Sequence, residues 1–415
     1  MKETVVSQRA ASVGGGWGHE TPRPYTPGRA VPADWGVSTP APGLYLHIPF
    51  CSAICPYCDF AVLTGGPEQR ERFTRHLIRE IEMCDLENFQ GMDTVYFGGG
   101  TPSALSPEQL VQIVASLPVR KDAWIFLEAN PEDVTPESVR AWRDLGVRTL
   151  SLGIQSFDAE ALAFLGRRHT PEQARRSVEL AREAGFHTVA LDLIYGLPGQ
   201  TAEAWRRTLE TAVALQPDHI SCYQLTIHEG TPFGFRLKRG KLTEAPEESQ
   251  AELFLLTHSF LRDAGWPGYE VSNFARSPEH QSRHNRKYWD HTPYLGVGPS
   301  AHSFDGRRRW WNERKIKPYE ARIDLGERPV AGSEELNAED LALEALMLGV
   351  RTVEGIDLER FRERYGIDLL ERNASLVERL GKEGLLQVEA GRLSPTLEGF
   401  AIADSLARDF EVSRS

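Results

Sequence analysis

The sequence contains few cysteines, no excess of basic residues and no long apolar run. Only five of its 415 residues are cysteine, an odd number, which argues against a secreted protein held together by disulfides. Acidic residues outnumber basic ones by 59 to 47, so the formal net charge is −12. A general nucleic-acid or anionic-membrane binder needs a basic surface, and this charge disfavours both, although it allows one local basic region.

Targeting and membrane signals are also missing. No window approaches the roughly 20 consecutive apolar residues of a membrane-spanning helix. The first ten residues, M-K-E-T-V-V-S-Q-R-A, contain no apolar core leading to a cleavage site. We therefore expect a cytoplasmic protein with no nucleic-acid partner and no transmembrane segment.

Four regions can be distinguished along the chain. Residues 1–42 are rich in glycine and proline with almost no apolar periodicity, which predicts a disordered tail. Short β-rich runs then alternate with helical stretches over residues 43–230, which indicates a parallel sheet. The six expected strands are residues 44–48, 94–97, 125–128, 149–153, 188–193 and 220–225. Six such units form an α/β fold, a partial (β/α)6 barrel whose chemistry lies at the strand carboxyl ends.

Helix boundaries support these units. Ser106, Thr135 and Thr170 each precede a proline and a glutamate, an arrangement typical of a helix start with a hydroxyl at the N-cap. Gly146 and Gly185 stand where left-handed residues would end two of the helices.

The last two regions are less regular. Residues 231–332 are rich in aromatic side chains, histidine and arginine, and we predict a connecting region without assigning it a fold. In residues 333–415 the pattern predicts helices at 339–348, 358–365 and 375–383, a hairpin near 389–391 and a last helix near 396–407. These elements indicate a smaller, mainly helical, winged-helix-like domain. Because that last helix carries Glu398 and Asp404 and is not basic, structural packing is favoured over DNA binding.

Three cysteines are concentrated directly after the first expected strand. Cys51, Cys55 and Cys58 follow a C-x3-C-x2-C spacing. A structural zinc site needs four ligands, and no second cysteine pair exists, although His47 is a candidate fourth ligand. Three thiolates are what a 4Fe-4S cluster needs when one iron stays open. Cys84 and Cys222, in an expected helix and strand, are interpreted as inert core thiols.

Other expected strand ends carry polar or glycine residues. The second strand is followed by G-G-G-T-P, whose backbone amides are unobstructed by side chains, although such a run is also typical of an ordinary tight turn. Glu128 follows the third strand and Gln155 the fourth, and Asp192 lies within the fifth. A polar group in an apolar run costs free energy unless it has a partner, so a shared site is indicated.

Together these motifs resemble the radical SAM superfamily. H-I-P-F-C, C-P-Y-C-D-F, F-G-G-G-T-P-S, G-I-Q-S-F and D-L-I-Y-G-L-P-G-Q are similar to its coproporphyrinogen III oxidase-like branch. The resemblance implies a 4Fe-4S cluster on the three cysteines, with S-adenosylmethionine chelating the open iron. It also implies S-adenosylmethionine-contacting roles for Tyr45, Tyr57, Gly99, Gly100, Thr101, Glu128, Gln155, Arg167 and Asp192. The alternatives are that Tyr45 packs in the barrel and that Arg167 is exposed beside Arg168.

Within that branch the sequence resembles the HemW-type heme chaperones. The oxygen-independent oxidases carry a further cysteine just after the third ligand, whereas Asp59 follows Cys58 here. The segment H-N-R-K-Y-W, residues 284–289, resembles a motif of the chaperones, which implies heme as cargo and His284 as an axial ligand. The rival ligands are His280, His291 and His302, and Arg307, Arg308 and Arg309 are candidate partners of the heme propionates.

The same resemblance implies particular partners. They are heme, a heme-acceptor protein of the respiratory type and an electron donor such as a flavodoxin or ferredoxin, with a second copy of the chain as a further candidate. No catalytic residue is assigned on this interpretation. The alternative is an enzyme, a radical SAM oxidoreductase that acts on a porphyrinogen.

Overall fold

The computed structural model describes residues 40–413. The predicted disordered tail therefore lies outside the described residues except for its last three. Two of these are attached to the folded part: the Pro42 carbonyl accepts from the Asp93 N–H at 3.2 Å, and the Ala41 carbonyl accepts from Lys287 Nζ at 2.5 Å. The residues directly before the first strand therefore contact the folded part.

The expected parallel sheet is confirmed. Its six central strands pair in parallel in the order of the chain. They are β1 (Gly43–Ile48), β2 (Thr94–Gly99), β3 (Trp124–Ala129), β4 (Val147–Gln155), β5 (Thr188–Tyr195) and β6 (His219–Gln224). Because the strands are buried on both faces, they are mostly apolar, and the few polar residues near their carboxyl ends are conspicuous.

Short strands from residues 231–332 extend both edges of this sheet. β7 (Asn273–Ala275) pairs antiparallel with β6, and β8 (Tyr294–Val297) pairs parallel with β1. β9 (His302–Phe304), β10 (Arg308–Asn312) and β11 (Val330–Glu335) then follow β8 outward in antiparallel fashion. Within the described residues the sheet has eleven strands, so this region is part of the sheet and more than a connection.

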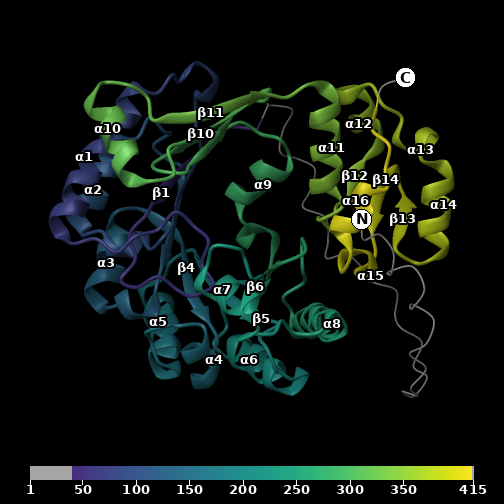
Figure 1. Cartoon of the computed structure of the whole chain (residues 1–415), viewed down its shortest axis with the longest axis horizontal. Helices are drawn as coiled ribbons and strands as arrows, with labels where there is room; N and C mark the ends of the chain where they lie inside the picture. Colours follow the sequence, from purple (N-terminus) through teal and green to yellow (C-terminus); the bar gives the residue numbers. More distant parts are fainter. Residues whose placement is uncertain (1–39, 414–415) are drawn as a thin grey trace.

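Helices cover the outside of the curved sheet (Figure 1). Those between the central strands are α1 (Pro67–Met83), α2 (Pro107–Ser116), α3 (Pro136–Asp144), α4 (Ala159–Phe164), α5 (Pro171–Ala184) and α6 (Ala202–Ala214). The expected caps are confirmed, since Ser106, Thr135 and Thr170 each accept from the backbone N–H three residues later. Gly185 ends α5 with a φ of +72°, and Gly146 follows α3 with a φ of +94°, as left-handed residues do at helix ends.

Further helices follow β6, and short 3-10 turns occur between the strands. The helices are α7 (Pro232–Lys238), α8 (Glu247–Ala264), α9 (Arg283–Trp289) and α10 (Ile316–Asp324), with 3-10 turns η1 (Glu87–Phe89), η2 (Pro102–Ala104), η3 (Pro131–Asp133) and η4 (Pro278–His280). Within residues 40–413, no helix is both long and apolar enough to cross a membrane.

The C-terminal part has its own core beside the barrel. It contains α11 (Ala338–Gly349), α12 (Leu358–Tyr365), α13 (Leu369–Arg372) and α14 (Ala374–Lys382), and a small sheet of β12 (Ile356–Asp357), β14 (Arg392–Pro395) and β13 (Leu386–Glu389). The single last helix predicted at 396–407 is wrong: α15 (Leu397–Phe400) and α16 (Ala403–Arg408) replace it. The break allows Phe400 to pack in the barrel core while Leu406 packs in the C-terminal core.

Candidate functional site

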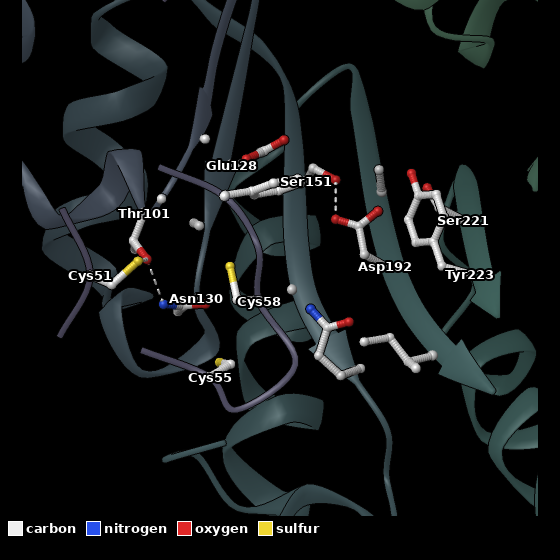
Figure 2. A pocket seen from close by; sticks show the side chains of 18 of the residues that line it. Cys51, Cys55, Cys58, Thr101, Glu128, Asn130, Ser151, Asp192, Ser221 and Tyr223 are labelled. Atoms are coloured by element: carbon white, nitrogen blue, oxygen red, sulfur yellow. Dashed lines mark hydrogen bonds between the residues drawn. The ribbon is translucent and has the colours of Figure 1, made fainter. Parts of the chain in front are cut away.

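A cavity of about 480 Å³ lies inside the barrel, with the cysteine loop at one end. This loop, residues 51–58, follows β1, and the ends of β2, β3 and β4 contribute Thr101, Glu128 and Gln155 to the cavity wall. Figure 2 shows the three cysteines on one side and Asp192 with Tyr223 on the other. The volume of the cavity is in the range of ligand-binding pockets. The cavity also lies where a site at the carboxyl ends of the strands is expected.

The cysteine loop is held by backbone and side-chain hydrogen bonds. The Cys51 N–H donates to the Leu63 carbonyl at 2.9 Å. The Thr101 hydroxyl donates to Cys51 Sγ and Arg167 Nη1 donates to Cys55 Sγ, each at 3.5 Å. These donors stabilise sulfur atoms that carry negative charge. All three thiols are half-buried and line the cavity.

Burial nevertheless disfavours free thiolates here. It raises the pKa of Cys51 to about 11, against the lowering effect of the Thr101 hydrogen bond, and it also raises the pKa of Cys58. Thiolates in such a place need positive charge from a bound group. Three cavity-facing sulfur donors suit an iron–sulfur cluster. No three histidine, cysteine or acidic side chains of residues 40–413 converge to hold a single ion.

The glycine turn after β2 packs against the start of the cysteine loop. A Cβ at Gly100 would lie 2.8 Å from the Ile48 and Phe50 carbonyl oxygens. The Gly100 N–H donates to the Ile48 carbonyl at 2.8 Å and the Thr101 N–H to the Phe50 carbonyl at 2.7 Å. The expectation of free amides is therefore wrong for these two residues. Glycine is needed here because the two backbones approach so closely.

Two half-buried carboxyl groups share the cavity wall. Glu128 Oε1 accepts from the Tyr96 hydroxyl at 2.8 Å, and Asp192 Oδ2 accepts from the Ser151 hydroxyl at 2.9 Å. Burial and the nearby Asp192 raise the pKa of Glu128 to about 7, and burial raises the pKa of Asp192. A pair of this kind favours a cationic ligand, which would relieve both the burial cost and the mutual repulsion.

Arg167 places a positive charge on the cavity wall. Its Nη2 donates to Asn130 Oδ1 at 2.5 Å and to the Gly153 carbonyl at 3.0 Å. Its Nε is buried without a hydrogen-bond partner, and no carboxylate of residues 40–413 forms an ion pair with it. The alternative of an exposed pair with Arg168 does not apply, because Arg167 is half-buried and lines the cavity whereas Arg168 alone is exposed. A half-buried cation without a carboxylate partner favours an anionic ligand group.

The other predicted contact residues differ in their placement. Gln155 lines the cavity with a φ of +63°, a strained value for a non-glycine residue that is often found at functional sites. Tyr57 also lines it. Tyr45 does not: it stacks on Tyr96, with ring centroids 6.1 Å apart, and its hydroxyl lies 3.1 Å from His47 Nδ1. The contacts of Tyr45 therefore match the alternative interpretation, in which this side chain packs in the barrel.

Several residues that line the cavity are not predicted by the sequence motifs. Asn130 bridges Thr101 (3.0 Å) and Arg167, and Ser221 and Tyr223 point inward from β6. The signal for the last two was the alternation of residues along a strand. His219, on the same face of β6, is buried with an unpartnered Nδ1.

The predicted heme ligand His284 is buried behind the cavity wall. Its Nδ1 lies 2.9 Å from the Thr94 hydroxyl and its Nε2 lies 3.0 Å from the Tyr288 hydroxyl. Burial lowers its pKa to about 3. Both ring nitrogens are therefore engaged in this structure, and Asn285, its neighbour, is the residue that lines the cavity.

The rival histidines lie in three different places. His280 lines the cavity, with Nδ1 2.9 Å from the Thr188 hydroxyl and Nε2 3.8 Å from Asp218 Oδ1. His291 is buried, 3.3 Å from the Tyr365 hydroxyl, whereas His302 is exposed and stacks on Trp311 at 5.8 Å.

The three candidate propionate-binding arginines lie on β10 or directly before it, and each has a partner on β11 or α11. Arg309 forms a bidentate pair with Glu344, with both N–O distances 2.7 Å. Arg307 pairs with Glu335 at 3.4 Å, and Arg308 donates to the Ser333 hydroxyl at 3.2 Å. Propionate binding by Arg309 would therefore compete with a well-formed ion pair.

Comparison with known proteins places these observations in a family context. Residues 45–212 match the radical SAM superfamily model, and residues 336–402 match the HemN C-terminal domain model. The heme chaperone HemW of Mycobacterium tuberculosis is 36% identical over 392 residues, covering 92% of this chain and 98% of that protein. HemW of Bacillus subtilis is 33% identical, covering 86% and 95% respectively.

Among solved structures, coproporphyrinogen III oxidase (HemN) from Escherichia coli, a radical SAM enzyme, superposes with a TM-score of 0.76. The match covers 89% of each chain at 23% sequence identity. At that identity the likeness establishes the fold, and the fold agrees with the expected partial barrel and helical C-terminal part.

Proposed function

The chain belongs to the HemW heme chaperone family, in the coproporphyrinogen III oxidase-like branch of the radical SAM superfamily, and we propose that it binds heme and passes it to an acceptor protein, of the respiratory type. The observation that carries this proposal is the similarity to HemW proteins over nearly their whole length. Asp59 directly after Cys58, where the oxidases carry a further cysteine, supports it. In this proposal residues 43–230 form the barrel that binds the cofactors, and residues 333–415 form a separate unit.

The cavity supports a cofactor role for named residues. Cys51, Cys55 and Cys58 would hold a 4Fe-4S cluster, which supplies one electron to S-adenosylmethionine when both are bound. The Arg167 guanidinium, which lines the cavity, would bind a carboxylate and orient it beside the cysteine loop. Glu128 and Asp192 accept hydrogen bonds from ammonium or hydroxyl groups, and the glycine turn brings Thr101 close to Cys51.

Heme ligation by His284 requires a change in its surroundings. Iron binding at Nε2 would displace the Tyr288 hydroxyl, and α9 would have to move to expose the ring. His280 already lines the cavity, and its Nε2 lies 3.8 Å from Asp218 Oδ1. We therefore propose His284 as the ligand of a rearranged state and His280 as the ligand if the described state binds heme directly.

A second candidate function is porphyrinogen oxidation. It is favoured by the full set of polar residues around the three thiols, which a passive carrier would not need. Conversion of coproporphyrinogen III to protoporphyrinogen IX at an enzymatic rate by the reduced protein would establish it and exclude a pure carrier.

The test is an anaerobic heme titration of the cluster-loaded protein, followed by Soret absorbance. Wild type is compared with His284→Ala and His280→Ala, each with its iron content verified. Saturation near one heme per chain, with altered affinity or spectrum in one variant, is the expected result. Loss in His284→Ala would mean that α9 moves, and loss in His280→Ala would place heme at the cavity. Weak binding that is identical in all three proteins would contradict the chaperone proposal.

A further inference from the structure

We propose that α7 and the exposed side of the cysteine loop form the docking surface for an acidic one-electron carrier, a protein of the flavodoxin or ferredoxin kind. The inference rests on the proposed function, because the cluster on Cys51, Cys55 and Cys58 is the electron acceptor. One electron leaves the reduced carrier and enters the cluster, so the carrier is oxidised by one electron and the cluster is reduced by one. No group is transferred.

The charge of α7 is opposite to that of the chain as a whole. Residues 231–243 carry four basic residues and no acidic one, in a chain with a formal net charge of −12. Arg236, Lys238, Arg239 and Lys241 are all exposed. Within residues 40–413 none of the four forms an ion pair, whereas four of the eight exposed arginines on α1, α5 and α6 do. Four unneutralised cations on one short segment attract an acidic protein.

This basic segment is fastened to the cysteine loop. The Phe233 N–H donates to the carbonyl of Pro56, between the second and third cysteines, at 2.9 Å. The Phe233 ring lies 6.4 Å from the Tyr57 ring, and the Arg236 guanidinium lies 5.6 Å from the Phe233 ring centre. Because α7 packs directly on the loop, a carrier held by these cations is brought next to the thiols. Electron transfer falls off steeply with distance, so this placement matters.

The exposed side of the loop is apolar and has further cations. Ile54 is 48% exposed and Phe60 is 61% exposed, and Phe235 on α7 is 54% exposed. Arg168 donates to the Ser52 carbonyl at 3.4 Å, and Arg314 donates to the Asp59 carbonyl. The exposed acidic side chains next to the loop and to the basic segment are Asp59, Glu229 and Glu244, and Glu247 and Glu248 follow at the start of α8.

This composition fits a small, transient protein interface. Weak electron-transfer complexes bury little surface, and complementary charge steers their encounter. An anionic membrane would also be attracted by the cations. However, α7 has seven residues and one exposed phenylalanine, whereas interfacial helices bury a broad apolar face. The location on the cysteine loop therefore favours the acidic carrier.

The test uses a purified acidic flavodoxin as the probe. The variant Arg236→Glu/Lys238→Glu/Arg239→Glu is compared with wild type, and Lys238→Glu/Lys241→Glu is a second variant that leaves the Arg236 contact with Phe233 intact. The matched control is Arg75→Glu/Lys121→Glu/Arg140→Glu, which reverses three exposed charges on and near α1, α2 and α3. Binding of oxidised flavodoxin is measured by titration, and reduction of the cluster by reduced flavodoxin is measured by anaerobic stopped flow.

We expect both α7 variants to bind flavodoxin at least ~10-fold more weakly and to accept electrons at least ~10-fold more slowly at low ionic strength, with the difference shrinking at high salt. Reduction by photoreduced deazaflavin, a small molecule, should stay at the wild-type rate, and the control should match wild type. Unchanged flavodoxin kinetics in both α7 variants would overturn the proposal. The proposal would also be overturned if the α7 variants lost binding to phosphatidylserine vesicles while their flavodoxin kinetics stayed unchanged, because the surface would then bind a membrane.

Two other measurements would show whether the proposed function, and not the docking surface, has failed. Iron and sulfide content reports the cluster, and Soret absorbance reports heme. Flavodoxin binding can also be measured on Cys55→Ser, so the docking surface is tested even without a cluster.

Discussion

Glu128 is expected to make the affinity for S-adenosylmethionine depend on pH. Its side chain is half-buried on the cavity wall, and the pKa of Glu128 is raised to about 7 by burial and by Asp192. S-adenosylmethionine carries a sulfonium and an ammonium group, so it should bind better when Glu128 is ionised. For a pKa of about 7, roughly a tenth of the molecules are ionised at pH 6 and roughly nine tenths at pH 8. Affinity should therefore rise nearly ~10-fold, about 1.4 kcal/mol, over that interval.

The assay is anaerobic isothermal titration calorimetry of the cluster-loaded protein with S-adenosylmethionine from pH 6 to pH 8. Glu128→Gln should lose ~10-fold or more in affinity at pH 8, because a charge-assisted hydrogen bond is replaced by a neutral one, and its affinity should be flatter with pH. Tyr96→Phe should move the wild-type profile to higher pH, since the Tyr96 hydroxyl lowers the pKa of Glu128.

The matched control is Glu132→Gln, whose carboxylate faces His169 Nδ1 at 3.4 Å and does not line the cavity. It should keep the wild-type profile. Affinity that stays flat or falls from pH 6 to pH 8 in wild type, or an unchanged profile in Glu128→Gln, would refute the role of Glu128.

Three other perturbations test the cysteine loop and the frame of the barrel. Cys55→Ser should abolish cluster assembly while circular dichroism shows a folded chain, and an unchanged iron content would refute the ligand assignment. Gly100→Ala should lower cluster content, because its Cβ would meet the Ile48 and Phe50 carbonyls at 2.8 Å; wild-type iron and sulfide would show that the loop tolerates the shift. Buried Glu80 accepts from the Tyr319 hydroxyl at 2.6 Å and from the Gly298 N–H at 2.7 Å, and burial raises its pKa to about 7. Because a raised pKa contributes stability at low pH that is lost as pH rises toward 7, wild type should lose up to roughly 3 kcal/mol from this group between about pH 4.5 and pH 7. Glu80→Gln should show a flatter urea-midpoint profile over that range, and an equally steep profile would contradict this assignment.

Local signals explain why the barrel was predictable from the sequence. Each helix start at Ser106, Thr135 and Thr170 is specified by residues within four positions of one another, and the structure has the same caps. The strand-end residues Glu128 and Asp192 could be recognised as polar groups in apolar runs. Their convergence on one cavity follows from the parallel order of the strands.

Features that depend on distant contacts were not predictable. β7 and β9 are three residues long, too short for a periodic pattern, and they exist because the sheet edges at β6 and β8 offer hydrogen-bond partners. The break between α15 and α16 depends on two separate cores. The burial of His284 also depends on α9 packing beside β2, which its own motif does not reveal.

We propose that the protein carries heme and does not consume a porphyrinogen. The most direct test divides one anaerobic, reduced, cluster-loaded preparation into two parts. One part receives heme, and the bound heme per chain is determined. The other part receives S-adenosylmethionine and coproporphyrinogen III, and the products are identified. The account predicts about one heme per chain and unchanged coproporphyrinogen III. Protoporphyrinogen IX formed over many turnovers, with no saturable heme binding, would contradict it.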